Sequence, residues 1–381
     1  MAHTIALPAL YNTTLHSTPT ADFNNETTLN NMTFGPVLKD ESQSSSGAGV
    51  TEIVLFSFLF FVIGVVGIFG NFLVVYAIVC DRKMRASVTN LLITNLALAD
   101  LVIMVFGIPE IIQFMMNKGW ILEELLCKAN RFILVVSLYA SVMTLVSICI
   151  ERYIGIIQPI KAHILCSRAR IAVVVILIWP VAVAAGIPTL LLNRIEDGKS
   201  ELQVKLCQIR FPADHFHYYL VFKYTEFFLF YVIPLAIQIT LYAKVSRHLF
   251  TASDKLRRER ASDALLARRG VVKMLMVSVV VYFVSYSPQH ALLVYRTVKQ
   301  NDFRDTWTLN VLVIVIAYMN SAANPVLYSI FSQNFRTNFR RALCLLQRGP
   351  PAQPPRRQST LSTSNRFGRL TSLVPSAFSE V

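Results

Sequence analysis

The stretch FILVVSLYASVMTLVSICIERY, residues 132–153, begins as an unbroken apolar run and ends in an adjacent acid and base. A helix needs about 20 mainly apolar residues to cross a bilayer, so this run is long enough to span one. A charge at the bilayer centre costs roughly 2.5–3.5 kcal/mol on insertion scales, which places Glu151 and Arg152 at the membrane edge. Two interfacial anchor charges would explain such a pair in isolation, so the neighbouring sequence decides its role.

The composition indicates a polytopic membrane protein. The chain has 381 residues, of which 54% are hydrophobic and 15% are charged, and its mean hydropathy is +0.51. These values are too apolar for a soluble domain. Six cysteines are too few and too scattered for a disulfide scaffold. We find no nucleic-acid or metal-ligand pattern and no clustered nucleophile and base, so no enzyme is expected.

Residues 1–50 are polar and rich in Thr, Asn and Ser, so they are expected to be disordered. They hold three Asn-x-Ser/Thr sites, at Asn12, Asn25 and Asn31. Three such sites in one short tail predict a glycosylated segment outside the cell. The segment lacks a continuous apolar core, so no cleavable signal peptide is expected.

The sequence predicts an all-α membrane protein, with a seven-transmembrane helix bundle over residues 51–331. The expected spans are about 52–80, 88–116, 131–150, 169–192, 216–249, 266–298 and 306–330. Polar or basic loops are expected at 82–85, 193–214 and 250–265. Arg152 follows Cys127 by about 37 Å of helix at 1.5 Å per residue, so the two residues mark opposite membrane faces. Asp100 lies mid-span, where an acid is costly and a functional role is the default interpretation.

A short amphipathic cytoplasmic helix is predicted over residues 332–346, followed by a disordered cytoplasmic tail at 347–381. The apolar face of this helix would carry Phe335, Phe339, Leu343 and Leu346, and its basic face Arg336, Arg340 and Arg341.

The charges predict the orientation of the bundle. With each membrane residue assigned to its nearer face, the C-terminal side carries a net charge of +17 and the N-terminal side −3, which together give the formal +14. The positive-inside rule then places the C-terminus in the cytoplasm, and the sugar sites independently place the N-terminus outside. Anionic lipid and an acidic cytoplasmic partner account for the excess base without nucleic acid.

Seven spans with one characteristic motif each resemble the rhodopsin-like (class A) G-protein-coupled receptors, over about residues 51–346. The matching residues are Gly70-Asn71, Leu96 to Asp100, Trp120, Cys127, Glu151-Arg152-Tyr153, Trp179, Pro234 with Tyr242, Pro288, and Asn324-Pro325 with Tyr328. The resemblance implies a plasma-membrane receptor that activates a heterotrimeric G protein. The segment that begins at Lys83-Met84-Arg85 is also similar to that of neuropeptide receptors, including those for RFamide-type peptides.

The resemblance assigns roles to several residues. It implies a disulfide between Cys127 and Cys207, both on the outer side, where disulfides persist. It implies no cofactor other than an allosteric sodium ion, whose hard-cation chemistry suits oxygen ligands. The sodium pocket would comprise Asp100, Ser141, Asn320, Ser321 and Asn324. The activation switch would comprise Glu151, Arg152, Tyr153, Tyr242, Tyr286, Pro288, Asn324, Pro325 and Tyr328.

Two positions depart from the family pattern. Tyr286 stands where the sixth span usually carries Trp, which puts the usual activation trigger in doubt. Arg268 stands where many members carry an acid that holds the arginine of the third span. Since like charges repel, the inactive state is expected to hold Arg152 through Glu151 and other contacts.

The ligand class is predicted from the outer half of the bundle. Leu134 replaces the Asp of amine receptors and Tyr318 replaces the retinal-binding Lys of opsins. By family register the pocket is lined by Glu110, Gln113, Arg131, Leu134, Glu226, Gln289, His290, Arg296 and Asn310. Such mixed charges suit a peptide.

Desolvated acids require cationic partners. A basic residue of the ligand is expected to pair with Glu226 or Glu110, and Glu226 is the better candidate because Arg131 can neutralise Glu110. A lipid or small-metabolite receptor is the alternative, and a transporter the more remote one.

The tail predicts further partners. The segment at residues 356–372 is predicted to bind arrestin after receptor kinases phosphorylate it. The predicted phosphorylation sites follow Arg356-Arg357 and are Ser359, Thr360, Ser362, Thr363 and Ser364. Cys344, near the end of the amphipathic helix, is a candidate lipidation site.

Overall fold

A computed structural model describes residues 49–116, 118–197, 205–212, 215–256, 263–298 and 306–347. The side chains of 215, 249–269 and 343–347 lie outside this description. The chain divides into two units, Met1–Ala342 and Leu343–Val381, and the first unit holds the bundle. The predicted sugar sites, the tail phosphosites, and the side chains of Arg268 and Cys344 therefore lie outside the described residues.

Seven helical segments within the described residues are long and apolar enough to cross a membrane, which confirms the predicted fold class. Six of them are α1 (Val50–Cys80), α3 (Val88–Met115), α4 (Glu124–Ile157), α6 (Arg168–Leu192), α9 (Asp263–Val298) and α10 (Trp307–Phe331). The remaining span is composite, with α7 (His215–Phe227), the π-helical turn η2 (Phe228–Val232) and α8 (Ile233–Leu256).

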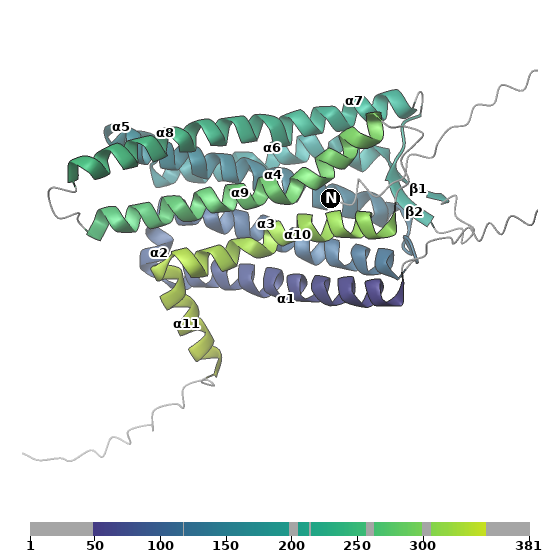
Figure 1. Ribbon diagram of the computed structural model, residues 1–381, viewed down its shortest axis with the longest axis horizontal. Coiled ribbons are helices and arrows are strands. Elements are labelled where there is room, and N and C mark those ends of the chain that lie inside the picture. Colours follow the sequence, from purple (N-terminus) through teal and green to yellow (C-terminus); the bar gives the residue numbers. More distant parts are fainter. Residues whose placement is uncertain are drawn as a thin grey trace, which may run out of the picture. The chain divides into compact units, whose positions relative to one another are not determined.

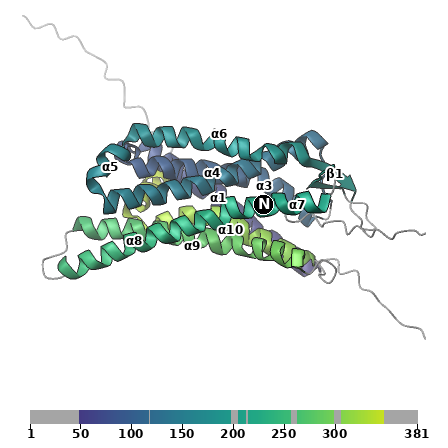
Figure 2. The ribbon, with the colours of Figure 1, turned by 90° about the horizontal axis from the view of Figure 1, so that it is seen from above.

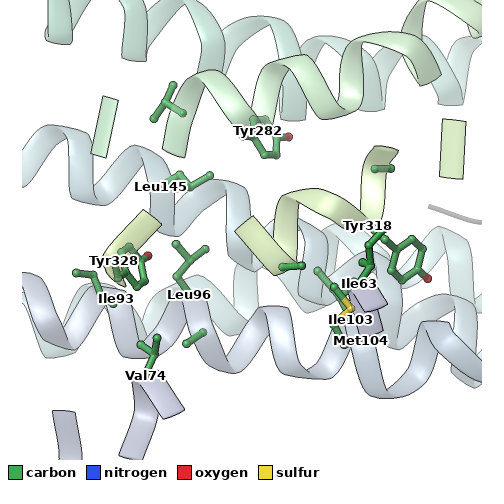
Figure 3. Close-up of a cluster of buried hydrophobic side chains, with 14 of the residues drawn as sticks. Ile63, Val74, Ile93, Leu96, Ile103, Met104, Leu145, Tyr282, Tyr318 and Tyr328 are labelled. Atoms are coloured by element: carbon green, nitrogen blue, oxygen red, sulfur yellow. The ribbon is translucent and has the colours of Figure 1, made fainter. Parts of the chain in front are cut away.

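Helices α1, α3, α4, α8, α9 and α10 form a closed ring of packed neighbours, and α6 packs against α4. Helix α1 packs against α3 and α10, α4 against α3, α6 and α8, and α9 against α8 and α10 (Figures 1 and 2). Figure 3 shows the apolar core between them, where Ile103 and Met104 of α3 lie near Tyr318 of α10. Tyr318 reaches this position because Gly107 has no side chain, since a Cβ there would overlap the tyrosine ring.

The basic loop expected at 82–85 is helical. The basic segment after the first span forms a short helix, α2 (Arg82–Ala86), because Asp81 caps it by accepting hydrogen bonds from the backbone N–H groups of Lys83 and Met84, at 2.8 and 3.0 Å. The hydrogen bond from Met84 is the main cause of the lowered pKa of Asp81. A second short helix, α5 (Pro159–Leu165), follows α4.

Two further expectations about connections were wrong. The loop expected at 193–214 contains an antiparallel hairpin, β1 (Asn193–Asp197) with β2 (Lys205–Ile209), which pairs Ile195 with Cys207. The linker expected at 250–265 is helical in its described residues, since α8 continues to Leu256 and α9 begins at Asp263. Helix α11 (Gln333–Gln347) covers the predicted amphipathic helix, and Phe335, Phe339 and Ala342 are buried.

The π-helical turn follows from a proline. Pro234 has no N–H group, so the carbonyl oxygen of Phe230, four residues earlier, lacks its helical partner. The Tyr282 hydroxyl of α9 donates a hydrogen bond to this oxygen at 3.0 Å. The proline thus frees an acceptor in the fifth span that a side chain of the sixth span satisfies.

Candidate functional site

The predicted disulfide is present and anchors the hairpin on α4. Cys127 and Cys207 are bonded, with Cα atoms 5.8 Å apart, and both side chains are buried. Trp120 packs against them, and its backbone N–H donates to the Lys205 carbonyl at 2.7 Å. We call this end of the bundle the disulfide end, and the opposite end of α4, which carries Arg152, the arginine end.

A buried ion pair lies next to the disulfide, as predicted. Arg131 Nη2 lies 2.5 Å from Glu110 Oε1 and donates to the Cys207 carbonyl at 2.9 Å. Asn130 Nδ2 donates to the other carboxylate oxygen of Glu110 at 2.8 Å. Nε and Nη1 of Arg131 are buried without a hydrogen-bond partner among the described residues. The pair therefore has no net charge but retains donors that the protein leaves unused.

The expectation that Glu226 awaits a partner from the ligand is corrected. Lys223, three residues earlier on α7, lies with its Nζ 2.6 Å from Glu226 Oε2, and the Tyr139 hydroxyl of α4 donates to Oε1. Residues three apart share one helix face, and Lys223 is itself 9% exposed. The three-residue spacing of Lys223 and Glu226 would have indicated this pair, but Lys223 was not among the predicted pocket residues.

The other predicted pocket residues have mixed surroundings at the disulfide end. His290 packs between Phe227 and Tyr231, with ring centroids 4.9 and 4.3 Å away. Arg296 Nη2 donates to Asn310 Oδ1 at 2.8 Å, so these two residues pair with each other. Gln113 accepts from the backbone of Ile121 at 3.3 Å, Leu134 is buried, and Gln289 is half-buried.

The residues proposed to hold sodium fit a cation. Asp100 is fully buried, and Asn324 Nδ2 donates to its Oδ2 at 2.8 Å. Oδ1 of Asp100 and the hydroxyls of Ser141 and Ser321 are buried without a hydrogen-bond partner among the described residues. Asn320 is buried on the same helix as Ser321. Buried oxygen atoms without donors are the ligands that a small hard cation satisfies.

Three side chains form a hydrogen-bonded cluster at the arginine end. Arg152 Nε donates to Glu151 Oε2 at 2.5 Å, and Nη2 donates to both Glu151 Oε1 and the Thr89 hydroxyl. Thr89 in turn donates to the Glu151 carboxylate, at 3.3 Å. Arg152 was expected to be held by Glu151 and by other contacts, and Thr89 provides one of those other contacts. We call these three residues the arginine cluster.

The predicted switch residues lie in several different surroundings. A cavity of about 310 Å³ at the arginine end is lined by Arg152, Thr89 and Phe335 among others. The ring of Tyr328 stacks on Phe335 with centroids 5.2 Å apart, and Tyr242 is buried. Tyr153 is half-buried, and Pro288 and Pro325 lie inside α9 and α10. Tyr286 is buried beside Tyr282, with ring centroids 4.8 Å apart.

The family model described as "7 transmembrane receptor (rhodopsin family)" matches residues 70–328, which hold the disulfide, Asp100 and the arginine cluster. The chain belongs to this family. It is accordingly a multi-pass membrane receptor that couples to G proteins, and not an enzyme.

Curated relatives match most of the receptor. It is 36% identical over 304 residues to neuropeptide receptor 15 of Caenorhabditis elegans, covering 74% of this chain and 88% of the relative. It is 30% identical over 355 residues to a QRFP-like peptide receptor of Branchiostoma floridae, covering 90% and 91%. It is also 28% identical over 291 residues to galanin receptor 2a of Danio rerio, covering 76% and 78%.

The bond between Tyr282 and Phe230 predicts an effect on basal signalling. Tyr282→Phe removes only the hydroxyl and with it the hydrogen bond to the Phe230 carbonyl, which contributes about 0.5–1.5 kcal/mol. If α9 moves during activation, losing this bond destabilises the inactive state in particular. We therefore expect basal G-protein activation to rise several-fold at normal surface expression. Tyr218→Phe, which removes an exposed hydroxyl at the disulfide end, is the control. Equal basal activity in the two variants would show that the bond does not restrain α9.

Proposed function

We propose that the receptor binds an extracellular peptide at the disulfide end and activates a heterotrimeric G protein at the arginine end. The observation that carries the proposal is that α4 bears residues of both sites, with Arg131 and Cys127 near one end and Glu151 and Arg152 near the other. A ligand that shifts α4 or its neighbours at the disulfide end acts on the same rigid helix that holds Arg152. Release of Arg152 from Glu151 would then present it to the G protein.

Three features support a peptide ligand. The relatives carry the names of peptide receptors, including those for galanin and for QRFP-like peptides. The disulfide end contains two acid–base pairs, Glu110 with Arg131 and Glu226 with Lys223. It also offers further donors and acceptors at Arg296 and Asn310. A basic ligand residue would bind Glu226 only by displacing Lys223, so the ligand's basic charge has weaker support than its peptide nature.

A library screen tests the ligand class. Cells that express the receptor are exposed in parallel to a neuropeptide library and to a panel of lipids and small metabolites, with G-protein activation as the readout. We expect activation by members of the peptide library alone. Activation confined to the lipid and metabolite panel would overturn the proposal and favour the alternative receptor class.

We further propose that the N-terminus is extracellular and the C-terminus cytoplasmic at the plasma membrane. The charge asymmetry and the three Asn-x-Ser/Thr sites support this orientation. A tag at residue 1 should bind antibody on intact cells, whereas a tag at residue 381 should require permeabilisation.

Sodium is expected to oppose activation through Asp100. A cation at this carboxylate stabilises the packed state of α3, α4 and α10, which surround it. Agonist affinity should fall when sodium replaces a large organic cation of equal concentration, and Asp100→Asn should abolish that dependence. The double variant Glu124→Gln/Lys128→Gln, which neutralises an exposed pair on α4, is the control. A sodium response that survives in Asp100→Asn would refute the site.

The tail is expected to recruit arrestin after receptor kinases act on it. Each phosphate would add about −1.5 to −2 charge. Changing Ser359, Thr360, Ser362, Thr363 and Ser364 to Ala should abolish agonist-driven arrestin recruitment and leave G-protein activation intact. Recruitment unchanged by all five substitutions would place the site elsewhere. Cys344 is proposed as a lipid anchor, which palmitate labelling of Cys344→Ser would test.

A further inference from the structure

The Glu110–Arg131 pair lines a small cavity. A cavity of about 40 Å³ is lined by these two residues together with apolar groups that include Ile111, Phe114 and Trp120. One water molecule needs roughly 10–15 Å³ of cavity volume, so this cavity has room for about three groups of that size. Gly119, with a φ of 60°, allows the chain to turn where it borders the cavity.

The polar groups of the pair are only partly used. Nη2 of Arg131 makes both of the interactions described above, while Nε and Nη1 have no partner in the part of the chain that the structure describes, although the residue is 6% exposed. A buried donor without an acceptor is unfavourable by about 1–3 kcal/mol. Each Glu110 oxygen accepts one hydrogen bond and retains a lone pair. The site therefore offers unused donors beside unused acceptors.

The charge balance selects the ligand group. A carboxylate here would be attracted to Arg131 but repelled by Glu110, and since these terms nearly cancel, its desolvation would remain uncompensated. A carboxylate also has no proton to donate to Glu110. A neutral carboxamide has the complementary pattern, since its oxygen accepts from Arg131 and its NH₂ donates to Glu110, at a much smaller desolvation cost.

We propose that this cavity binds a neutral primary carboxamide of the ligand, with its oxygen on Arg131 and its NH₂ on Glu110. The inference rests on the proposed function, because it specifies the chemistry of a peptide ligand. The group comes either from an amidated peptide C-terminus or from an Asn or Gln side chain. These two sources have the same chemistry and are separated by experiment.

The first test needs no known agonist. Thermal unfolding of the purified full-length receptor is measured with N-acetyl amino acids, each supplied as carboxamide, free acid and methyl ester. We expect carboxamides to raise Tm, with apparent dissociation constants at least about tenfold below those of the matching acids and esters, as expected for a charge-assisted hydrogen bond. Stabilisation by the Asn or Gln methyl esters, in preference to C-terminal amides, would identify a side chain as the source.

Matched variants assign the effect to the pair. Glu110→Gln/Arg131→Gln removes both charges together, so no charge is left buried alone, and it should abolish the preference for carboxamides. Glu124→Gln/Lys128→Gln neutralises an exposed pair on the same helix and should preserve the preference. Acids that stabilise as well as amides, or a Tm unaffected by every amide, would overturn the inference. These outcomes are independent of the library screen, whose failure would instead remove the peptide proposal.

Discussion

Lys223→Met is expected to lower the amount of folded receptor sharply. Lys223 and Glu226 form an ion pair whose side chains are only 10% and 18% exposed. Removing one partner leaves the carboxylate of Glu226 largely buried, with the Tyr139 hydroxyl as its one remaining donor among the described residues. Breaking a buried pair in this way costs about 3–5 kcal/mol, a large share of the stability of a typical protein. We expect a lower Tm for the purified receptor and several-fold less receptor at the cell surface.

The double variant Lys223→Met/Glu226→Gln separates charge imbalance from lost packing. It removes both charges, so most of the stability lost in Lys223→Met should return. Lys128→Met is the control, because its ion pair with Glu124 is exposed and should contribute less than about 1 kcal/mol. If Lys223→Met and Lys128→Met proved equally stable, Glu226 would have another partner, and a ligand cation at that acid would regain its support.

Glu151→Gln is expected to raise basal signalling by roughly tenfold to a hundredfold, up to the maximum of the receptor. The carboxylate holds Arg152 through charge-assisted hydrogen bonds, each contributing about 1.5–3 kcal/mol. Glutamine keeps the size of the side chain but removes the charge, which destabilises the closed state in particular. The increase in basal nucleotide exchange follows from that shift in population.

Thr89→Val provides a graded comparison. It removes one hydroxyl from the arginine cluster but leaves both bonds between Arg152 and the Glu151 carboxylate in place, so it should raise basal activity less than Glu151→Gln does. The expected order of basal activity is Glu151→Gln, then Thr89→Val, then the wild type. Thr94→Val is the control, since that hydroxyl bonds only within α3, to the Asn90 carbonyl. Wild-type basal activity in Glu151→Gln would show that other contacts hold the arginine end closed.

The fold was predictable because the sequence of each span contains a long apolar run and one characteristic residue. The pairing of Glu110 with Arg131 was also predictable, since the two neighbouring spans carry one acid and one base. The positions that failed depend on contacts without such a signal. The hairpin of β1 and β2 lies in a polar segment with weak alternation, and α2 depends on a single capping aspartate.

The contacts within the candidate site were harder to predict than the residues that form it. The Tyr139 hydroxyl reaches Glu226 from a different helix, and only the packing of α4 against the composite span brings them together. Thr89 reads as an ordinary residue near the start of α3 until the fold places it beside Arg152. Tyr282 became informative only when the Phe230 carbonyl, freed by Pro234, was found at its hydroxyl. In each case the sequence gives the side chain but not its partner.

Nucleotide exchange on a purified heterotrimeric G protein tests the central claim most directly. The full-length receptor is reconstituted in lipid vesicles and exposed to the peptides selected by the library screen, in parallel with Arg152→Ala. We predict peptide-dependent exchange by the wild type and none by Arg152→Ala, although both should bind the peptide. Equal exchange by the two receptors, or no exchange by the wild type with any bound peptide, would contradict the claim that the disulfide end signals through Arg152.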